Sequence, residues 1–559
     1  MPAITSVGSR QLNSDTVTGA MVTKSSNKCT QHSRSFTFDE AISETGYGLF
    51  HYKVFSICAL CILCVGFQNG LTSYVFSAAQ CDLGFKSQDL GLLNVSFMLG
   101  GTISAFLWGI IADVKGRRNV LVWTILLDGA VTLACSFMQN LTGLLVCRLF
   151  NGILIGCAGS VTYTYLAEFH SPKFRAKSVC YSGLAFIAGW VLLPILAYII
   201  LPLKFKIDIL KVAYTPWRVF LIIIAVPEIV AGLALLKLPE SPKFLHNKNY
   251  SEKALSILNN IYSQNKSKKD EGFLVKQLST NFTIPADIKH LQTKGKNARL
   301  ISEMVKQIKI LFGSEVRATT LLMCLLMFSN MFGYFGLGLW FPEFFIRFEN
   351  HYRLHPNISI TLKELDFSNN SNSTTECSAT FDANTFQNTL IVAASALVAN
   401  TLGGWLIGKI SIKMLALLTM LLGGASSLSV YWISSSLGIL IASSIFQSSM
   451  ATGNMVIGSI IVEQFPTSVG ALAMCMAISA GRIGAICSNM AFSMLLEKNT
   501  GAVIIIASVV LILGSVLCLL IPGKSYTIEN TIEKNSAIDT KPVVDVSVIT
   551  LDEHNNRTS

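Results

Sequence analysis

The residue pattern that most clearly predicts chemistry is a charged turn, Gly109-Ile-Ile-Ala-Asp113-Val-Lys-Gly116-Arg117-Arg118. Gly109 has no side chain and would let two helices approach closely, and Gly116 permits a tight turn that a Cβ atom would hinder. Asp113 can pair with a nearby Arg and can also face the positive N-terminus of a helix from the other half. Because such a contact can form in one conformation and break in another, we expect a clasp here. The alternative is an ordinary basic turn.

Three charged residues lie inside long apolar stretches: Asp128, Glu228 and Arg482. A charge surrounded by hydrocarbon is costly and commonly marks a functional site. We expect Asp128 and Glu228 to form a structural pair or a proton site at the lipid edge, and the alternative is that they bind the solute. Arg482, which follows Ser479-Ala-Gly, is expected to contact either an anionic substrate or a helix carbonyl.

Patterns for catalysis and for cofactors are absent from the sequence. It contains no GxxxxGK[ST] phosphate loop, no metal-ligand cluster and no nucleophile beside a credible base. We therefore predict that the protein is not an enzyme, binds no metal and uses no cofactor. The fourteen cysteines show no metal-binding spacing, although Cys81 and Cys377 could form a disulfide on the non-cytosolic side.

Long apolar helices must position these residues. The chain is 51% apolar and only 13% charged, whereas soluble domains are about 25% charged. Its apolar blocks approach the roughly 20 residues that cross about 30 Å of hydrocarbon. We predict an all-α membrane protein with twelve transmembrane helices in two six-helix bundles. The predicted helices cover 54–76, 88–112, 119–138, 141–166, 178–202, 217–238, 317–341, 387–408, 413–433, 436–462, 467–492 and 501–522.

Six helices, a polar segment and six more helices predict two halves that face a central cavity. Lys and Arg gather in the central segment and in alternate short loops, which places those parts and both tails in the cytosol. This distribution, rather than a nucleic-acid partner, accounts for the net charge of +11. The predicted parts are an N-terminal tail 1–53, a first bundle 54–238, a central segment 239–316, a second bundle 317–522 and a C-terminal tail 523–559.

Two polar regions lie outside the predicted helices. The first 50 residues contain no apolar signal-peptide core and are expected to be mostly disordered. The loop 343–386 is rich in Asn, Ser and Thr, and the topology places it in the lumen or outside the cell. Its sequons at Asn357, Asn369 and Asn372 therefore predict N-glycosylation.

The turn at 109–118 resembles the signature between the second and third helices of the major facilitator superfamily. Segments after the fourth and sixth predicted helices resemble signatures shared by its sugar-porter, organic-ion and synaptic-vesicle branches. That resemblance implies a major facilitator fold and a cytosolic ion-pair network that holds the inward face closed. It also implies a weaker latch in the second half, where Glu463 keeps the acid but Val469 and Gly470 replace the expected Arg. Further members carried over to the network are Arg148, Glu168, Arg175, Pro239, Glu240, Ser241 and Pro242.

A narrower resemblance lies at the end of the seventh predicted helix, in Phe332-Gly-Tyr-Phe-Gly-Leu-Gly-Leu-Trp-Phe-Pro-Glu343. This segment looks like the same helix of the synaptic vesicle glycoprotein 2 family. The segment Phe36-Thr-Phe-Asp-Glu-Ala41 and the large sequon-bearing loop after helix seven agree with that family. The resemblance covers residues 36–522.

In the major facilitator fold, helices 1, 4, 7 and 10 usually line the cavity, so polar residues on them are candidates for solute contacts. Amides with aromatic rings suit a neutral or weakly charged polar solute. The alternative for each is a hydrogen bond between helices. The candidates are Gln68, Asn69, Asn151, Tyr163, Asn330, Tyr334, Trp340, Gln447 and Asn454, together with Arg482 of helix 11.

The resemblance implies a secondary active transporter of a small organic solute that works by alternating access, with a gradient and a coupling ion in place of ATP. Helix 1 lacks the acid that many relatives carry, and Gln68 stands near its place, which weakens the case for proton coupling. The alternative function is a non-transporting vesicle glycoprotein that binds protein partners through its luminal loop or tails. Either protein would sit among lipids in the plasma membrane or in a secretory or synaptic-type vesicle membrane.

Overall fold

The computed structural model describes residues 36–209, 212–266, 273–278, 308–309, 311–314, 316–354, 360–361, 364, 383–407, 409–465, 467–496 and 498–522. Within these residues, eleven helices are long and apolar enough to cross a membrane. A twelfth, α3 (Ser87–Lys115), is bent by 48° between Ser104 and Leu107. The predicted sequons at Asn357, Asn369 and Asn372, and Cys377, lie outside the described residues.

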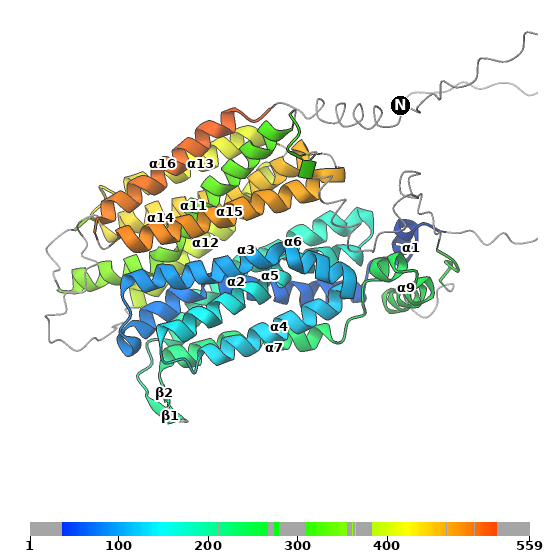
Figure 1. The fold of residues 1–559 in the computed structure, drawn as a ribbon, viewed down its shortest axis with the longest axis horizontal. Coiled ribbons are helices and arrows are strands. Elements are labelled where there is room, and N and C mark those ends of the chain that lie inside the picture. Colours follow the sequence, from blue (N-terminus) through cyan, green and yellow to red (C-terminus); the bar gives the residue numbers. More distant parts are fainter. Residues whose placement is uncertain are drawn as a thin grey trace, which may run out of the picture.

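The membrane helices form two bundles that lie side by side (Figure 1). Each predicted span corresponds to one helix, which confirms the all-α membrane fold. Because both the bundle interior and lipid favour apolar side chains, these helices are apolar nearly all round. The first bundle contains α2 (Leu49–Leu83), α3, α4 (Arg117–Cys135), α5 (Leu141–Glu168), α6 (Pro172–Ile200) and α7 (Pro216–Leu235). The second contains α11 (Arg317–Leu354), α12 (Ala383–Leu406), α13 (Ile412–Ser429), α14 (Ser436–Gln464), α15 (Thr467–Leu495) and α16 (Thr500–Leu519).

Three short helices mark one end of the molecule, which we call the cap end. They are α1 (Phe38–Glu44), α8 (Pro242–Asn247) and α9 (Ser251–Asn265). The opposite end, the hairpin end, carries an antiparallel hairpin of β1 (Ile207–Ile209) and β2 (Val212–Tyr214), as Figure 1 shows. Chain direction places both the start of α2 and the end of α16 at the cap end, and the connection from α11 to α12 at the hairpin end.

Three elements differ from the sequence-based expectation. The helix α11 continues thirteen residues beyond its predicted end at 341 and so takes up the start of the predicted loop 343–386. An ion pair between Glu343 and Arg347, 2.7 Å apart, stabilises this extension. The hairpin β1–β2 was not predicted, and α1 lies in a segment expected to be disordered. The helix α1 begins with a capping box between Thr37 and Glu40.

The cap is attached to the first bundle. The Asn265 side chain at the end of α9 accepts from Phe50 N (3.1 Å) and donates to Thr45 O (3.1 Å). It thereby satisfies a free N–H at the start of α2 and holds the connection between α1 and α2. Phe36 pairs with Leu278 in an isolated bridge, and Phe38 stacks on His246 of α8. These contacts make α1, α8 and α9 one unit with the first bundle.

Candidate functional site

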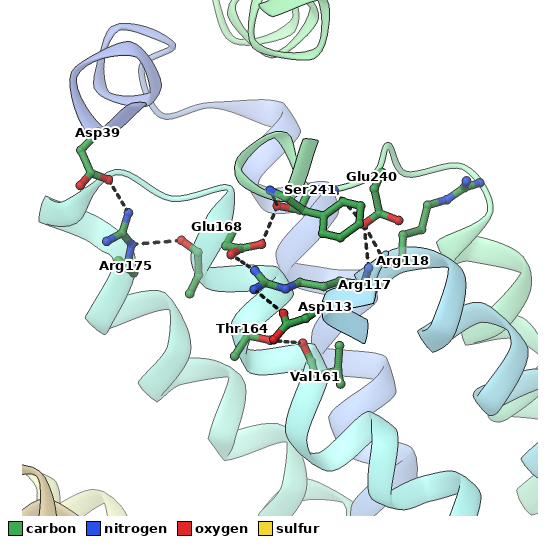
Figure 2. Close-up of polar contacts among 12 residues, drawn as sticks. Asp39, Asp113, Arg117, Arg118, Val161, Thr164, Glu168, Arg175, Glu240 and Ser241 are labelled. Atoms are coloured by element: carbon green, nitrogen blue, oxygen red, sulfur yellow. Dashed lines mark hydrogen bonds and ion pairs between the residues drawn. The ribbon is translucent and has the colours of Figure 1, made fainter. Parts of the chain in front are cut away.

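The turn between α3 and α4 lies at the centre of a charged network at the cap end (Figure 2). Gly116 has a φ of +102°, a conformation that side chains disfavour, so the turn depends on glycine as predicted. The Glu240 carboxylate accepts from the backbone N–H groups of Arg117 and Arg118, both at 3.0 Å. These are the first two N–H groups of α4, so Glu240 places a negative charge at the positive end of that helix.

Arg117 joins three elements through its side chain. Its guanidinium forms an ion pair with Glu168 at the end of α5 and a second with Asp113, one turn earlier on α3, at 3.2 Å. Glu168 also accepts from Ser241 Oγ at 2.5 Å, and Ser241 caps the N-terminus of α8. The network therefore binds α3, α4, α5 and α8 to one another (Figure 2).

A second branch reaches the cap helix α1. Arg175 on α6 forms an ion pair with Asp39 at 2.8 Å and donates to Ala167 O at 3.2 Å. Beside it, His170 is fully buried and its Nδ1 lies 2.8 Å from Leu166 O. Burial lowers the pKa of His170 below its ordinary value; the bond to Leu166 opposes this shift, and the nearby Arg175 adds to it.

Two residues assigned to this network play no such part here. A Cβ atom on Gly109 would have no neighbour within 4 Å, so Gly109 supports no close helix contact in this conformation. Arg148 lies near the hairpin end of α5, twenty residues from Glu168, which is roughly 30 Å along a helix. The assignment failed because α5 starts at the hairpin end and reaches the cap end only at its last residue.

The second half has no matching charge network among the described residues. Glu463 is exposed near the end of α14 and forms no described ion pair. Instead, Lys413 at the start of α13 donates to Leu519 O and Ile521 O, both at 2.7 Å. A cation therefore caps the C-terminus of α16.

The two predicted prolines of the first half lie on either side of Glu240 and Ser241. They are Pro239 and Pro242, and Tyr165 donates a hydrogen bond to Pro239 O at 2.6 Å.

A central cavity of about 260 Å³ lies between the bundles. Four predicted residues line it: Asn69, Tyr163, Asn454 and Arg482. Sequence reasoning missed its apolar lining from α3, α6 and α11, because aromatic residues and Met are frequent throughout the membrane segments and give no distinct signal. These missed residues include Phe97, Met98, Phe186, Met331 and Phe335.

The other predicted cavity residues lie elsewhere. Gln447 lines a smaller crevice toward the hairpin end, with Ser73, Tyr74 and Trp190. Tyr334 packs against Trp190 at a ring distance of 5.8 Å. Asn330 donates to Met450 O inside the second bundle (3.3 Å), and Trp340 is fully buried beside Phe344.

Gln68 and Asn151 belong to a buried polar cluster inside the first bundle. Arg148 donates to Gln68 Oε1 (2.6 Å), and Gln68 donates to Glu228 Oε1 (2.6 Å). Asn151 donates to Asp128 Oδ1 at 2.7 Å. Both carboxylates are fully buried, and each has one oxygen, Asp128 Oδ2 or Glu228 Oε2, without a hydrogen-bond partner. The cluster therefore joins α2, α4, α5 and α7.

Among the described residues, the side-chain hydrogen bonds between the halves lie from the middle of the membrane toward the hairpin end. Ser73 donates to Leu339 O (2.6 Å), and Ser77 donates to Glu343 (3.1 Å), which joins α2 to α11. Asn94 on α3 donates to Asn489 on α15 at 3.2 Å. Near the middle, Arg482 donates to Gly101 O. At the cap end, the charged network joins residues of the first half and the cap.

Comparison with known proteins adds the family. The chain is 26% identical over 327 residues to Synaptic vesicle glycoprotein 2B of Rattus norvegicus, which is 56% of this chain and 48% of that protein. It is 26% identical over 319 residues to Synaptic vesicle glycoprotein 2A of Homo sapiens, or 55% and 43%. The chain thus spans about half the length of the curated relatives it matches.

Solved structures agree on the fold. The xylose transporter XylE from E. coli, in a partially occluded inward open conformation, matches with a TM-score of 0.61 and 17% identity, over 85% of this chain and 98% of that one. A family model described as Major Facilitator Superfamily matches residues 58–362, more than half of the sequence. The chain belongs to the Major Facilitator Superfamily.

Proposed function

We propose that this protein is a secondary transporter of a small organic solute that works by alternating access. One observation carries the proposal: the central cavity is lined from both halves, while side chains join those halves toward the hairpin end. A rocking motion that broke these contacts would open the same cavity toward the hairpin end. The relatives and the family are consistent with this function.

The cap end is proposed to face the cytosol. Lys115, Arg117 and Arg118 lie at this end between α3 and α4, and Lys173 and Lys177 lie at the start of α6. Positive residues in short loops favour the cytosolic side. Both tails would then be cytosolic, and the loop after α11 would be luminal or extracellular. The vesicle glycoproteins among the relatives favour a vesicle membrane over the plasma membrane.

The buried cluster is proposed to hold the coupling ion, a proton. Asp128, Glu228 and Arg148 together would carry a net charge of −1 if all three were ionised. A net charge enclosed in the membrane is costly. One proton on either carboxylate would neutralise the cluster, and each acid has an oxygen without a hydrogen-bond partner that could carry the proton. These two acids would replace the helix 1 acid that the sequence lacks.

Accessibility labelling tests alternation directly. Ser77 is buried between the halves near the hairpin end, so Ser77→Cys should react with an impermeant maleimide only when that end opens. The background carries Ser at the exposed Cys180, Cys475 and Cys487, and also at Cys81 and Cys377, which the sequence places on the side of the hairpin end. Lys204→Cys, in the exposed loop at the same end, serves as the control that is always accessible.

Slow but complete labelling of Ser77→Cys, beside fast labelling of Lys204→Cys, would support the proposal. If Ser77→Cys in membranes never reacts with the maleimide, even when a panel of solutes is supplied on either side, the proposal is contradicted. That result would favour the non-transporting vesicle glycoprotein. Flux of sugars, amino acids and organic ions into proteoliposomes then identifies the solute.

A further inference from the structure

Arg482 is the charged side chain that lines the central cavity; the other lining residues are uncharged. It lies on α15 and donates from Nη1 to the backbone oxygen of Gly101 across the interface of the halves. Among the described residues, no carboxylate forms an ion pair with Arg482. An uncompensated cation inside a membrane protein is costly, so an anion that enters the cavity would be favoured.

The guanidinium has capacity for such an anion. An Arg side chain carries five N–H donors, and the bond to Gly101 O uses one of its nitrogens. Its planar fork matches a carboxylate in a two-bond arrangement. The charge thus has both the donors and the geometry to bind a ligand while the link to α3 stays in place.

The other residues that line the cavity indicate the size and polarity of a ligand that would fit it. Phe97, Phe335 and Met331 give it an apolar, largely aromatic wall. Asn454 also lines it, and its Oδ1 is buried without a hydrogen-bond partner, so it can accept from a ligand donor. The volume of about 260 Å³ lies just below the usual range of roughly 300–1,000 Å³ for drug-sized ligands. A small ligand with one ring or one branched chain fits these limits.

We propose that the central cavity binds a small organic monoanion, whose carboxylate pairs with Arg482 and whose apolar body packs against Phe97 and Phe335. This inference rests on the proposed transport function because it names the class of solute. The competing role for Arg482 is a link between the halves through Gly101 O. A link of that kind would not distinguish a charged ligand from a neutral one of the same shape.

Matched pairs of acids and amides separate these roles. Benzoate, phenylacetate and 4-methylpentanoate are each compared with benzamide, phenylacetamide and 4-methylpentanamide, using the purified full chain in nanodiscs and calorimetric titration. We expect at least one acid to bind about tenfold or more tightly than its amide. Arg482→Gln should weaken that acid by about 10- to 100-fold, the usual effect of losing a charge-assisted hydrogen bond, and leave the amide unchanged.

Two further variants complete the experiment. Arg482→Lys keeps the charge without the fork, so an intermediate loss is expected. Lys409→Gln removes one charge from the same half at an exposed site beside Trp405 and should leave acid binding unchanged. The inference is overturned if no acid binds better than its amide, or if Arg482→Gln weakens acid and amide equally.

Failure here differs from failure of the transport proposal. If Ser77→Cys is labelled as expected but no acid is preferred, the protein alternates and the anion site is wrong. If an acid binds through Arg482 but Ser77→Cys never reacts, the site stands and transport is wrong.

Discussion

The Glu240 side chain caps the N-terminus of the membrane helix α4. Replacing it with Ala removes the acceptor of two N–H groups of α4 and the charge that faces the helix dipole. We expect a loss of about 1–2 kcal/mol in the free energy of unfolding. Glu463→Ala, at an exposed acid of the second half that corresponds to Glu168, should change stability by less than about 0.5 kcal/mol. Thermal unfolding in detergent measures both, and equal shifts would show that the capping bonds contribute nothing.

His170 gives the cap end a pH dependence. Because burial lowers its pKa in the folded protein, the unfolded chain binds this proton first, near the ordinary value of 6.5. Its contribution to stability is complete above about pH 6.5 and declines as the pH falls below that value, by at most about 1.4 kcal/mol per unit. His170→Asn should therefore flatten the fall in melting temperature between pH 7 and 5. An unchanged slope in the variant would assign the pH dependence to other groups.

The buried cluster of Asp128, Glu228 and Arg148 joins the membrane helices of the first half. Its net charge predicts how substitutions in it change the stability of the protein. Arg148→Met removes the cation that is linked to Glu228 through Gln68 and leaves two buried acids uncompensated. Breaking a direct buried ion pair costs about 3–5 kcal/mol, so we expect a loss of up to that size. Adding Glu228→Gln removes one acid as well, so the double variant should recover part of that loss. Melting temperatures of the two variants decide the matter; a double variant less stable than Arg148→Met would rule out the charge balance.

The attachment of the cap helices to the first bundle depends more on the side-chain amide of Asn265 than on the ion pair between Asp39 and Arg175. Asp39 and Arg175 are partly exposed, and such pairs contribute about 0–1 kcal/mol. Asn265 instead holds the start of α2 and the turn before it. Asn265→Ala should therefore speed amide hydrogen exchange in residues 36–50 more than Asp39→Asn does. The reverse order would place the docking energy in the ion pair.

The sequence predicted helices well and their orientations poorly. Apolar blocks locate each span because hydrocarbon demands them. Which face of a span meets the cavity is harder to predict, because lipid and the bundle interior accept the same side chains. Gln68 and Asn69 are neighbours, yet only Asn69 reaches the cavity. The turn at Gly116 was predictable because its φ and its neighbouring charges are local, whereas the burial of Arg148 depends on helices distant in sequence.

If the two halves rock as proposed, the interface between them sets the balance between conformations. The Asn489 side chain accepts a hydrogen bond from Asn94 and donates one to Phe335 O, both at 3.2 Å. It therefore joins α3, α15 and α11 toward the hairpin end. Asn489→Leu removes the bond to Asn94, the one of the two that crosses between the halves, at about 1 kcal/mol. We expect Ser77→Cys to be labelled about fivefold faster or more in this variant. Asn330→Leu, whose amide bonds within the second half, is the control; equal acceleration by both would indicate general loosening.

The attachment of α1, α8 and α9 to the first bundle has a mechanical consequence. The last described residue, Pro522, accepts a hydrogen bond from Gln464 of the second bundle at 3.3 Å, so the first and the last described segments are attached to different bundles. Any rocking of one body against the other changes the separation between α9 and Pro522. A partner bound to both α9 and the segment at Pro522 would therefore respond to occupancy of the cavity without contacting it, and by reciprocity it would change the affinity of that cavity for its solute.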